Sequence, residues 1–221
     1  MFTGIIEETG SISAILRNGN AIRLTIHANK ILQDIKAGDS IAVNGICLTA
    51  TGFTASAFTA DVMHETISRT SLSHLRQGSM VNLERAMCMN GRFGGHIVTG
   101  HIDGTGTIIK IARDASAQWY TIRTTPKIMR YIVEKGSIAI DGISLTVAKT
   151  ARDSFCVSVI PHTMKHTALA SKAVHDTVNL ENDYIGKYIE KFIPGGKETS
   201  SNVTRELLAN YGYESVFEAR S

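Results

Sequence analysis

Two short segments of the sequence carry small reactive side chains in the same pattern. Residues 45–49 (GICLT) and 142–146 (GISLT) place Cys47 and Ser144 at equivalent positions. Alternate residues of a strand face the same way, so each would share a face with the threonine two residues later. A thiol or hydroxyl there could act as a nucleophile or position a water. The alternative is structural: the small side chain fills a tight place in a barrel, and the threonine bonds to the backbone.

Histidines supply a second set of chemical groups. TGII at residues 3–6 becomes TGHI at residues 99–102, so that His101 replaces Ile5. A histidine titrates near neutral pH and can carry protons during a reaction. His101 could instead be a half-exposed strand residue. His96, beside two glycines, could equally be the active histidine or inert.

Polar residues also gather where a strand is expected to pass into a helix. Residues 63–66 (MHET) align with residues 160–163 (IPHT). The first turn of a helix offers free backbone N–H groups to polar ligands. Ordinary capping, with Thr66 and Thr163 as the N-caps, is the alternative.

Metal and nucleotide chemistry is not indicated by any motif. The segment HETIS lacks the second histidine of HExxH, and there is no CxxC, GxSxG or GxxxxGK[ST]. Residues 104–106 (GTG) are interpreted as a turn, and no GxGxxG follows a strand and opens a helix. We therefore expect no metal and no nucleoside triphosphate.

The chain contains its own sequence twice. Residues 40–84 align without a gap on residues 137–181 and agree at 16 of 45 positions, where ordinary usage would give about three by chance. Residues 2–12 match residues 98–108 at 6 of 11 positions. An offset of 97 residues (137 minus 40) is too long for a solenoid unit and indicates two duplicated domains. Two like domains carry two like pockets, and differences between the copies could give two bound molecules different roles.

Composition narrows the class of protein further. The 221 residues are 43% hydrophobic with a net charge of +3, and the scattered basic residues do not favour nucleic-acid binding. An odd count of three cysteines argues against a disulfide scaffold and suits a reducing cytoplasm. We expect no signal peptide and no membrane span, because neither a basic-then-apolar start nor a run of 18 apolar residues is present.

The elements that must position these residues are mostly short strands. Asn44-Gly45 and Asp141-Gly142 lie between apolar runs, the strongest short hairpin signal. Frequent turns between β-branched segments predict an all-β chain of small closed barrels. The expected strands are residues 21–26, 40–43, 46–51, 57–62 and 81–83, then 138–140, 143–148, 155–160 and 178–180. The expected helical turns are residues 29–35, 66–75, 126–133 and 163–170.

The C-terminal tail has no copy in the first half. Ile185, Tyr188, Ile189 and Phe192 follow the spacing of one helix face, and residues 199–211 could form a last helix. The apolar face favours oligomerisation, with packing on its own subunit as the alternative. The expected domains are residues 1–96, 97–186 and 187–221, and the glycine-rich residues 87–95 are expected to be a flexible connection.

The motifs MFTGIIEE, NGICLT, GGHIVTGHIDGTG, KGSIAIDGISLT, IPHT and VNLE resemble, in order and in both halves, the riboflavin synthases of the alpha-chain type. The resemblance implies two tandem homologous six-stranded Greek-key β-barrels and a C-terminal α-helix. It also implies a homotrimer, with the working site between the N-terminal barrel of one subunit and the C-terminal barrel of its neighbour. Lumazine synthase is a candidate partner.

The implied reaction is a dismutation. One molecule of 6,7-dimethyl-8-ribityllumazine gives a four-carbon unit to another, yielding riboflavin and 5-amino-6-(ribitylamino)uracil, the last step of riboflavin biosynthesis, without a cofactor. His101, Cys47 and Ser144 are the implied catalytic residues. We expect His101 to move protons, Cys47 or Ser144 to assist addition or position water, and the positioning of two reactants to dominate the rate.

The resemblance also implies a set of substrate-binding residues, divided between the barrels. In the first barrel they are Gly4, Ile5, Ile6, Cys47, Leu48, Thr49, Asp61, Val62, Met63, His64, Glu65 and Thr66. In the second they are Gly100, His101, Ile102, Lys135, Ser144, Leu145, Thr146, Ile160, Pro161, His162, Thr163, Met164 and Lys165. Asp141 and Asp183 match polar family positions near the site.

Two other functions remain open. Lumazine-carrying proteins of luminous bacteria share the duplicated barrel and bind their ligand without converting it. Against that alternative, both copies here keep the polar GxxLT face and the TGxI opening. A nucleic-acid-binding barrel would need exposed aromatic residues and a basic stripe, whereas aromatic residues make up only 6% of the chain.

Overall fold

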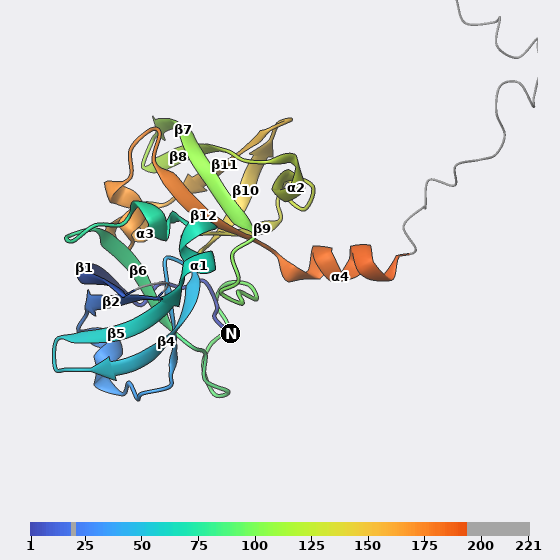
Figure 1. Ribbon diagram of the computed structural model, residues 1–221. Helices are drawn as coiled ribbons and strands as arrows, with labels where there is room; N and C mark the ends of the chain where they lie inside the picture. Colours follow the sequence, from blue (N-terminus) through green and yellow to red (C-terminus); the bar gives the residue numbers. More distant parts are fainter. Residues whose placement is uncertain (19–20, 194–221) are drawn as a thin grey trace, which may run out of the picture. The chain divides into compact units, whose positions relative to one another are not determined.

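Short antiparallel strands and tight turns form most of the chain, as the sequence predicts. The computed structural model describes residues 1–18 and 21–193. The chain divides into two units, Met1–Tyr184 and Ile185–Ser221. The first unit contains two closed barrels built from the two copies of the repeat, running from blue to green and from green to orange in Figure 1.

The first barrel has six strands in the order β1-β2-β5-β4-β3-β6, all antiparallel to their neighbours. The strands are β1 (Glu8–Asn18), β2 (Ala21–His27), β3 (Ser40–Val43), β4 (Ile46–Phe53), β5 (Ala57–Met63) and β6 (Met80–Arg85). Short helical turns connect them: η1 (Lys30–Gln33), α1 (His64–Ser68) and η2 (Ser71–His74).

The second barrel repeats this topology as β7-β8-β11-β10-β9-β12. Its strands are β7 (Gly104–Asp114), β8 (Ala117–Arg123), β9 (Ser137–Ile140), β10 (Ile143–Thr150), β11 (Ser154–Val159) and β12 (Thr177–Asn182). Its helical turns are α2 (Pro126–Met129), α3 (Pro161–His166) and η3 (Ala168–Ser171). The predicted pair of six-stranded barrels is confirmed, and each barrel closes around its own apolar core.

Three strands, β1, β7 and β8, go beyond the sequence prediction, and one predicted turn is wrong. Residues 104–106 begin strand β7 instead of turning. Gly106 is needed there because a Cβ would lie 2.5 Å from Ile122 Cγ2 and 2.8 Å from Leu180 Cδ1. A glycine inside a strand marks close packing as well as turns, and the pattern alone does not separate the two.

The two predicted hairpin turns meet each other between the barrels. Asn44 and Asp141 have φ angles of 47° and 44°, and Gly45 and Gly142 have 78° and 81°, as type I′ turns require. A Cβ on Gly45 would lie 2.7 Å from the backbone nitrogen of Gly142, and the reverse distance is the same. The two turns are therefore packed backbone to backbone, and only glycine fits at their contact.

Two buried asparagines bind each turn to the opposite barrel. The Asn82 side chain donates to the Asp141 carbonyl at 2.9 Å and accepts from the Ala168 amide at 2.7 Å. The Asn179 side chain makes the equivalent bonds in the other direction: it donates to the Asn44 carbonyl at 2.9 Å and accepts from the Ser71 amide at 2.7 Å. Such reciprocal contacts are those of an approximate twofold axis.

One position of this interface departs from the symmetry. The buried Asp141 carboxylate lies 3.2 Å from Lys172 Nζ. Burial raises the pKa of Asp141 above its ordinary value, and the charge of Lys172 opposes that rise. The aligned residues in the first copy are Asn44 and Leu75, and Asn44 Nδ2 is buried without a hydrogen-bonding partner in the described chain.

Helix α4 (Tyr184–Phe192) begins at the last residue of the first unit and forms most of the described part of the second, residues 185–193; it confirms the predicted helix. Its apolar residues Ile185, Tyr188, Ile189 and Phe192 are all exposed, from 50% to 75%. The predicted last helix, over residues 199–211, lies outside the described residues. Among the helices of the described residues, none has the length and apolar character to cross a membrane.

Removing the Asn179 side chain should destabilise the barrel pair. Asn179→Ala leaves the buried Ser71 N–H and Asn44 carbonyl without hydrogen-bonding partners. Each unpaired group costs about 1–3 kcal/mol of folding free energy. The free energy of unfolding, measured with urea, should fall by several kcal/mol. Asn29→Ala, the same change at an exposed asparagine, should cost about 0.5 kcal/mol or less. Equal losses in the two variants would show that the interface bonds contribute nothing.

Candidate functional site

The GxxLT strands turn their polar residues away from the barrel cores. On β4, Cys47 is half-buried and Thr49 exposed, whereas Leu48 between them is 5% exposed and packs in the first core. On β10, Ser144 and Thr146 follow the same alternation. Neither residue fills a barrel core, yet Cys47 packs against a separate buried cluster of Phe2, Ala42, Val98 and Ala139, so the structural alternative stays a prediction.

The segment that begins each copy, here called the opening segment, lies against a strand of the other copy. That strand carries Ser144 (β10) or Cys47 (β4), and we call these two the reactive strands. The Gly4 carbonyl accepts a hydrogen bond from the Ser144 amide at 2.8 Å, and the Gly100 carbonyl accepts one from the Cys47 amide at 3.0 Å. The next apolar residues follow the same crossing, since Ile6 packs on the second core and Ile102 on the first.

This crossing corrects the expected division of the substrate-binding residues. Gly4, Ile5 and Ile6 were expected with the first barrel, but Gly4 and Ile6 contact the second, and Gly100 and Ile102 contact the first. The alignment assigned each segment to its own copy because chain continuity is all that a sequence repeat records.

The crossing segments approach so closely that only glycine fits. Gly4 and Gly100 have φ angles of +76° and +82°. A Cβ on Gly4 would lie 2.6 Å from Ser144 Cβ, and one on Gly100 would lie 2.5 Å from Cys47 Cβ. The backbone of one copy therefore forms part of the surface around the reactive side chain of the other.

His96 and Ser144 form a hydrogen-bonded pair. His96 Nδ1 lies 2.6 Å from Ser144 Oγ, and the His96 amide donates to the Thr3 carbonyl at 3.1 Å. Gly95 lies so close that a Cβ would be 2.0 Å from the same carbonyl. The two glycines before His96 are not only connectors, because Gly95 allows His96 to reach Ser144. The sequence names His96 but could not choose between active and inert.

The surroundings of His96 favour a neutral imidazole. Burial lowers the pKa of His96 below its ordinary value of 6.5, and the charge of Asp183 opposes this. Within the described chain, Nε2 is buried and has no hydrogen-bonding partner. A neutral imidazole bonded to a hydroxyl is suited to accept a proton.

His101 lies on the side of the first barrel. It is exposed, and its Nδ1 lies 3.2 Å from Thr99 Oγ1. Since the adjacent Gly100 bonds to Cys47, the crossing brings His101 to the Cys47 strand and leaves Ile5 with the Ser144 strand. Each reactive strand thus has one histidine from the other part of the chain, His101 for Cys47 and His96 for Ser144.

The other predicted first-barrel residues lie on the last residues of β5 and on helix α1. Asp61 is exposed and already forms a two-point ion pair with Arg23, at 2.7 and 2.9 Å; the hydrogen bond from Arg23 lowers the pKa of Asp61. Val62 is buried in the core, so only its backbone can meet a ligand. Met63, His64 and Glu65 are exposed and Thr66 is half-buried.

The predicted caps of the two short helices are wrong. Helices α1 and α3 begin two residues before Thr66 and Thr163, directly after Met63 and Ile160, and neither has a side-chain cap. In the second helix Pro161 occupies the first turn, where its fixed φ starts a helix without a cap. Both threonines therefore lie within the helices.

The predicted second-barrel residues are spread over three elements. Ile160 is 58% exposed and Met164 packs on the second core, as Leu145 does from β10. Lys135 lies in the turn before β9 with a φ of 68°, and its amide donates a hydrogen bond to the Val147 carbonyl on β10. Of the predicted residues on α3, Pro161, His162 and Lys165 are exposed and Thr163 is half-buried.

A cavity of about 460 Å³ joins α3 to the N-terminal segment. It is lined by Ile6, Glu7 and Glu8 from that segment and by His162 and Lys165 from α3. Thr9 and Lys30 of the first barrel also line it, so the N-terminal segment and part of the first barrel meet α3 at this cavity.

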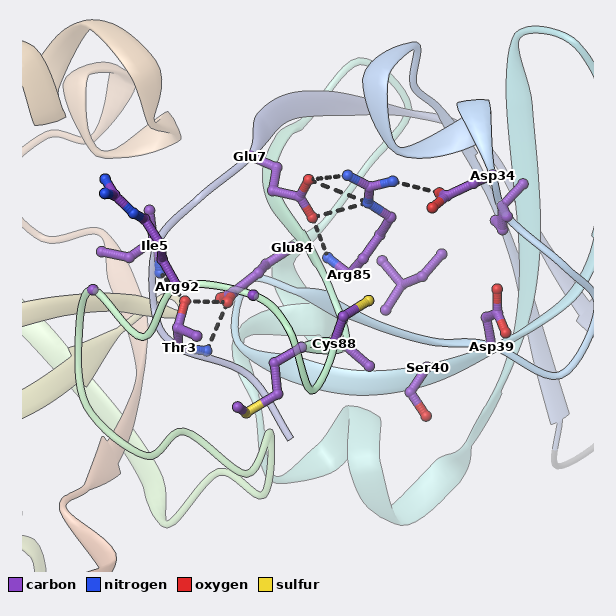
Figure 2. A pocket seen from close by; sticks show the side chains of 16 residues that line it. Thr3, Ile5, Glu7, Asp34, Asp39, Ser40, Glu84, Arg85, Cys88 and Arg92 are labelled. Atoms are coloured by element: carbon purple, nitrogen blue, oxygen red, sulfur yellow. Dashed lines mark hydrogen bonds and ion pairs between the residues drawn. The ribbon is translucent and has the colours of Figure 1, made fainter.

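A larger cavity of about 690 Å³ lies beside the first barrel and includes Thr3, Ile5, Glu84 and Arg85 (Figure 2). Arg85 bonds to Glu7 and Asp34 across it. Burial acts to raise the pKa of Glu7, but the hydrogen bonds and charge of Arg85 outweigh it, so the pKa is lowered.

The three implied catalytic residues lie outside these cavities. Cys47, Ser144 and His101 line neither of the two, nor a third of about 670 Å³ beside α3. In the single chain His101 is exposed, whereas Cys47 and Ser144 are half-buried beside the crossing segments. No group of three or more potential metal ligands occurs among the described residues.

A duplicated barrel with the same polar outer face in both copies defines a protein with two like sites for small molecules. The sequence profile of the lumazine binding domain family matches residues 3–86 and 99–183, once for each barrel. With the relatives described next, this places the chain in the riboflavin synthase family.

The relatives are similar over almost their whole length. A riboflavin synthase of Actinobacillus pleuropneumoniae is 58% identical over 96% of this chain and 100% of its own. One from Bacillus subtilis (strain 168) is 49% identical over the same shares. Among solved structures, LumP complexed with riboflavin is 26% identical with a TM-score of 0.77, over 82% of this chain and 99% of its own.

Replacing His96 should weaken the dependence of stability on acid. Because burial lowers the pKa of folded His96, the unfolded chain takes up a proton first as pH falls through about 6.5. Stability is present above that value and is lost as pH falls toward the lowered folded pKa. The slope of unfolding free energy against pH between 7.5 and 5 should be shallower in His96→Gln.

His101→Gln is the matched control, since it removes one imidazole at an exposed position. A wild-type slope in His96→Gln would show that His96 is not desolvated in the folded protein.

Proposed function

We propose that this chain is an enzyme of the transferase kind that converts two molecules of 6,7-dimethyl-8-ribityllumazine into riboflavin and 5-amino-6-(ribitylamino)uracil. One bound molecule gives a four-carbon unit to the other. The observation that carries the proposal is the pair of crossed sites: each reactive strand, with Cys47 or Ser144, is completed by the opening segment of the other copy.

The chain's polar groups suit a flat heterocycle with a hydroxylated side chain. Thr49 and Thr146 are exposed on the outer side of their strands, and their hydroxyls can bond to the amide edge of the ring. Lys165 and the polar residues of α1 and α3 can meet the ribityl hydroxyls.

The first chemical step is removal of a proton from the C7 methyl group of the donor. Burial lowers the pKa of His96 and so favours its neutral form, and His96 is hydrogen-bonded to Ser144, so this pair is suited to take that proton. His101, on the side of Cys47, would move protons at the acceptor ring. A placed proton carrier contributes about 10²–10⁴ in rate, whereas fixing two reactants in register is worth on the order of 10⁵ M of effective concentration or more.

The working site joins two subunits. Thr49 and Thr146 are exposed on the single chain, so a neighbouring barrel can cover each bound ring and exclude water. We assign residues 1–96 and 97–186 to the two lumazine-binding domains and residues 187–221 to assembly of a homotrimer. The exposed apolar residues of α4 support that assignment.

Compartment and partner follow from the same proposal. The three cysteines are free, which suits the reducing cytoplasm. Lumazine synthase, the enzyme class that makes the substrate, is the protein partner that fits.

The competing function is a carrier that binds lumazine or flavin without converting it. The LumP structures favour it, because one of them is complexed with 6,7-dimethyl-8-(1'-D-ribityl) lumazine at a TM-score of 0.74. Two features oppose it here: both copies keep the outward polar pair, and Ser144 has a histidine partner at 2.6 Å.

The deciding experiment mixes the purified chain with 6,7-dimethyl-8-ribityllumazine alone and follows riboflavin absorbance. We expect one riboflavin for every two molecules consumed, with no added cofactor. Binding of the lumazine, measured by its fluorescence, without any riboflavin would establish the carrier instead.

Obstructing the site beside Cys47 should lower kcat more than replacing the sulfur of Cys47. Cys47→Ser keeps a small polar side chain, and kcat should stay within about tenfold of the original. Gly100→Ala drives a methyl group into Cys47, and kcat should fall by roughly 100-fold or more. Gly38→Ala is the control, because Gly38 also has a positive φ but no atom within 4 Å of its Cβ position.

Abolished turnover in Cys47→Ser, with two ligands still bound, would reverse this order. It would make covalent chemistry at the sulfur, and not positioning, the main contribution.

A further inference from the structure

Each opening segment is bound by one buried carboxylate. Glu84, on β6 and 4% exposed, accepts three hydrogen bonds from the N-terminal segment. The Thr3 amide and hydroxyl donate to Oε1, both at 2.7 Å, and the Gly4 amide donates to Oε2 at 3.0 Å. Figure 2 shows the Glu84 carboxylate facing Thr3 at the edge of the larger cavity.

The second copy repeats this arrangement atom for atom. Glu181, on β12 and 1% exposed, accepts from the Thr99 amide at 2.6 Å, from the Thr99 hydroxyl at 2.7 Å and from the Gly100 amide at 3.0 Å. In both copies the threonine hydroxyl also accepts from the amide two residues on, at 3.3 Å. Two buried carboxylates with the same three donors indicate a required backbone geometry.

The carboxylate and the reactive strand it serves belong to different barrels. Glu84 is in the first barrel and binds Gly4, whose carbonyl bonds to Ser144 in the second. Glu181 is in the second barrel and binds Gly100, whose carbonyl bonds to Cys47 in the first. Each carboxylate therefore acts on the opposite barrel through one glycine.

The geometry points to Glu84 and Glu181 as crossed positioning residues: Glu84 sets the substrate site on the second barrel, and Glu181 sets the site on the first. Neither needs to touch substrate. This assignment rests on the proposed function only for the identity of the ligand, because the crossing itself is a property of the free chain.

Both carboxylate oxygens are needed in this arrangement. One oxygen serves the threonine and the other serves the glycine, so all three partners are donors. In a glutamine one oxygen becomes an NH₂ group, which cannot accept from the glycine amide. Charge-assisted bonds of this kind are also stronger than neutral ones. Glu84→Gln and Glu181→Gln should therefore release Gly4 and Gly100, respectively, with little change in shape.

Amide hydrogen exchange of the full-length chain, followed by mass spectrometry, tests the crossing without ligand. Glu181→Gln should speed exchange of the Cys47 amide about tenfold or more and leave the Ser144 amide unchanged. Glu84→Gln should do the reverse. Each variant is the matched control for the other, because the chemical change is the same. Faster exchange on the same barrel, on both strands equally or on neither would overturn the assignment.

The same exchange experiment with ligand added tests whether the crossing controls ligand binding at the two sites. Saturating 6,7-dimethyl-8-ribityllumazine should slow exchange around Cys47 and Ser144 in the unchanged protein. In Glu181→Gln the slowing around Cys47 should be lost and that around Ser144 kept, with the reverse in Glu84→Gln. Slowing kept on both strands in both variants would show that the carboxylates do not set the sites. No slowing in the unchanged protein would contradict the proposed function. The experiment without ligand would still test whether each carboxylate acts on the opposite barrel.

Threonine variants guard against misfolding of the glutamine variants. Thr3→Val and Thr99→Val remove one of the three donors with little change in size, and they should show the same crossed pattern with smaller changes. Thr3→Ser and Thr99→Ser keep the hydroxyl and should restore exchange to the original rates. A purely structural role would give losses in thermal stability without any difference between Cys47 and Ser144.

Discussion

The contact between two hairpin turns, backbone against backbone at Gly45 and Gly142, is the constraint on which the remainder of the structure depends. Each turn needs two residues with positive φ, and each must present a surface without a Cβ to the other. The turns are also buried, so their polar groups require partners, and Asn82 and Asn179 supply these from the opposite barrels. The strands that carry Cys47 and Ser144 start directly after these turns. Their mutual position is therefore fixed at the point where the two copies touch.

The same contact explains where the two copies can differ. Backbone contacts must be kept on both sides, whereas side chains that face away from the axis are free to change. Asp141 and Lys172 form a buried ion pair where the first copy has Asn44 and Leu75. Such a pair is weak evidence for extra stability, because the cost of burying the charges offsets their attraction. Cys47 and Ser144 differ outside the barrel cores, where both are small enough to lie against Gly100 and Gly4 of the other copy.

Much of the architecture could be predicted from the sequence, because the repeat, the turn dipeptides and the period-two alternation are local signals. The crossing could not be predicted, since no local pattern records whether Gly4 packs on its own copy or on the other. The same holds for the pair of His96 and Ser144, which are 48 residues apart. Two of the three missing strands, β1 and β7, have a similar cause: Gly10 and Gly106 resemble turn residues, yet a Cβ on either would lie 2.5 Å from a core side chain.

The crossed arrangement gives the two sites the same backbone geometry and still allows their side chains to differ. The hydrogen bonds that place each opening segment are made by backbone amides and one threonine hydroxyl to a glutamate. They do not depend on the side chain at the next position, so Ile5 and His101 occupy equivalent places without disturbing either barrel. Because that position belongs to one copy and borders the reactive strand of the other, a single change there adds His101 on the side of Cys47. The equivalent place on the side of Ser144 keeps the apolar Ile5, and the histidine partner of Ser144 is His96. Two identical ligands can then experience different surroundings although the backbone around them is the same.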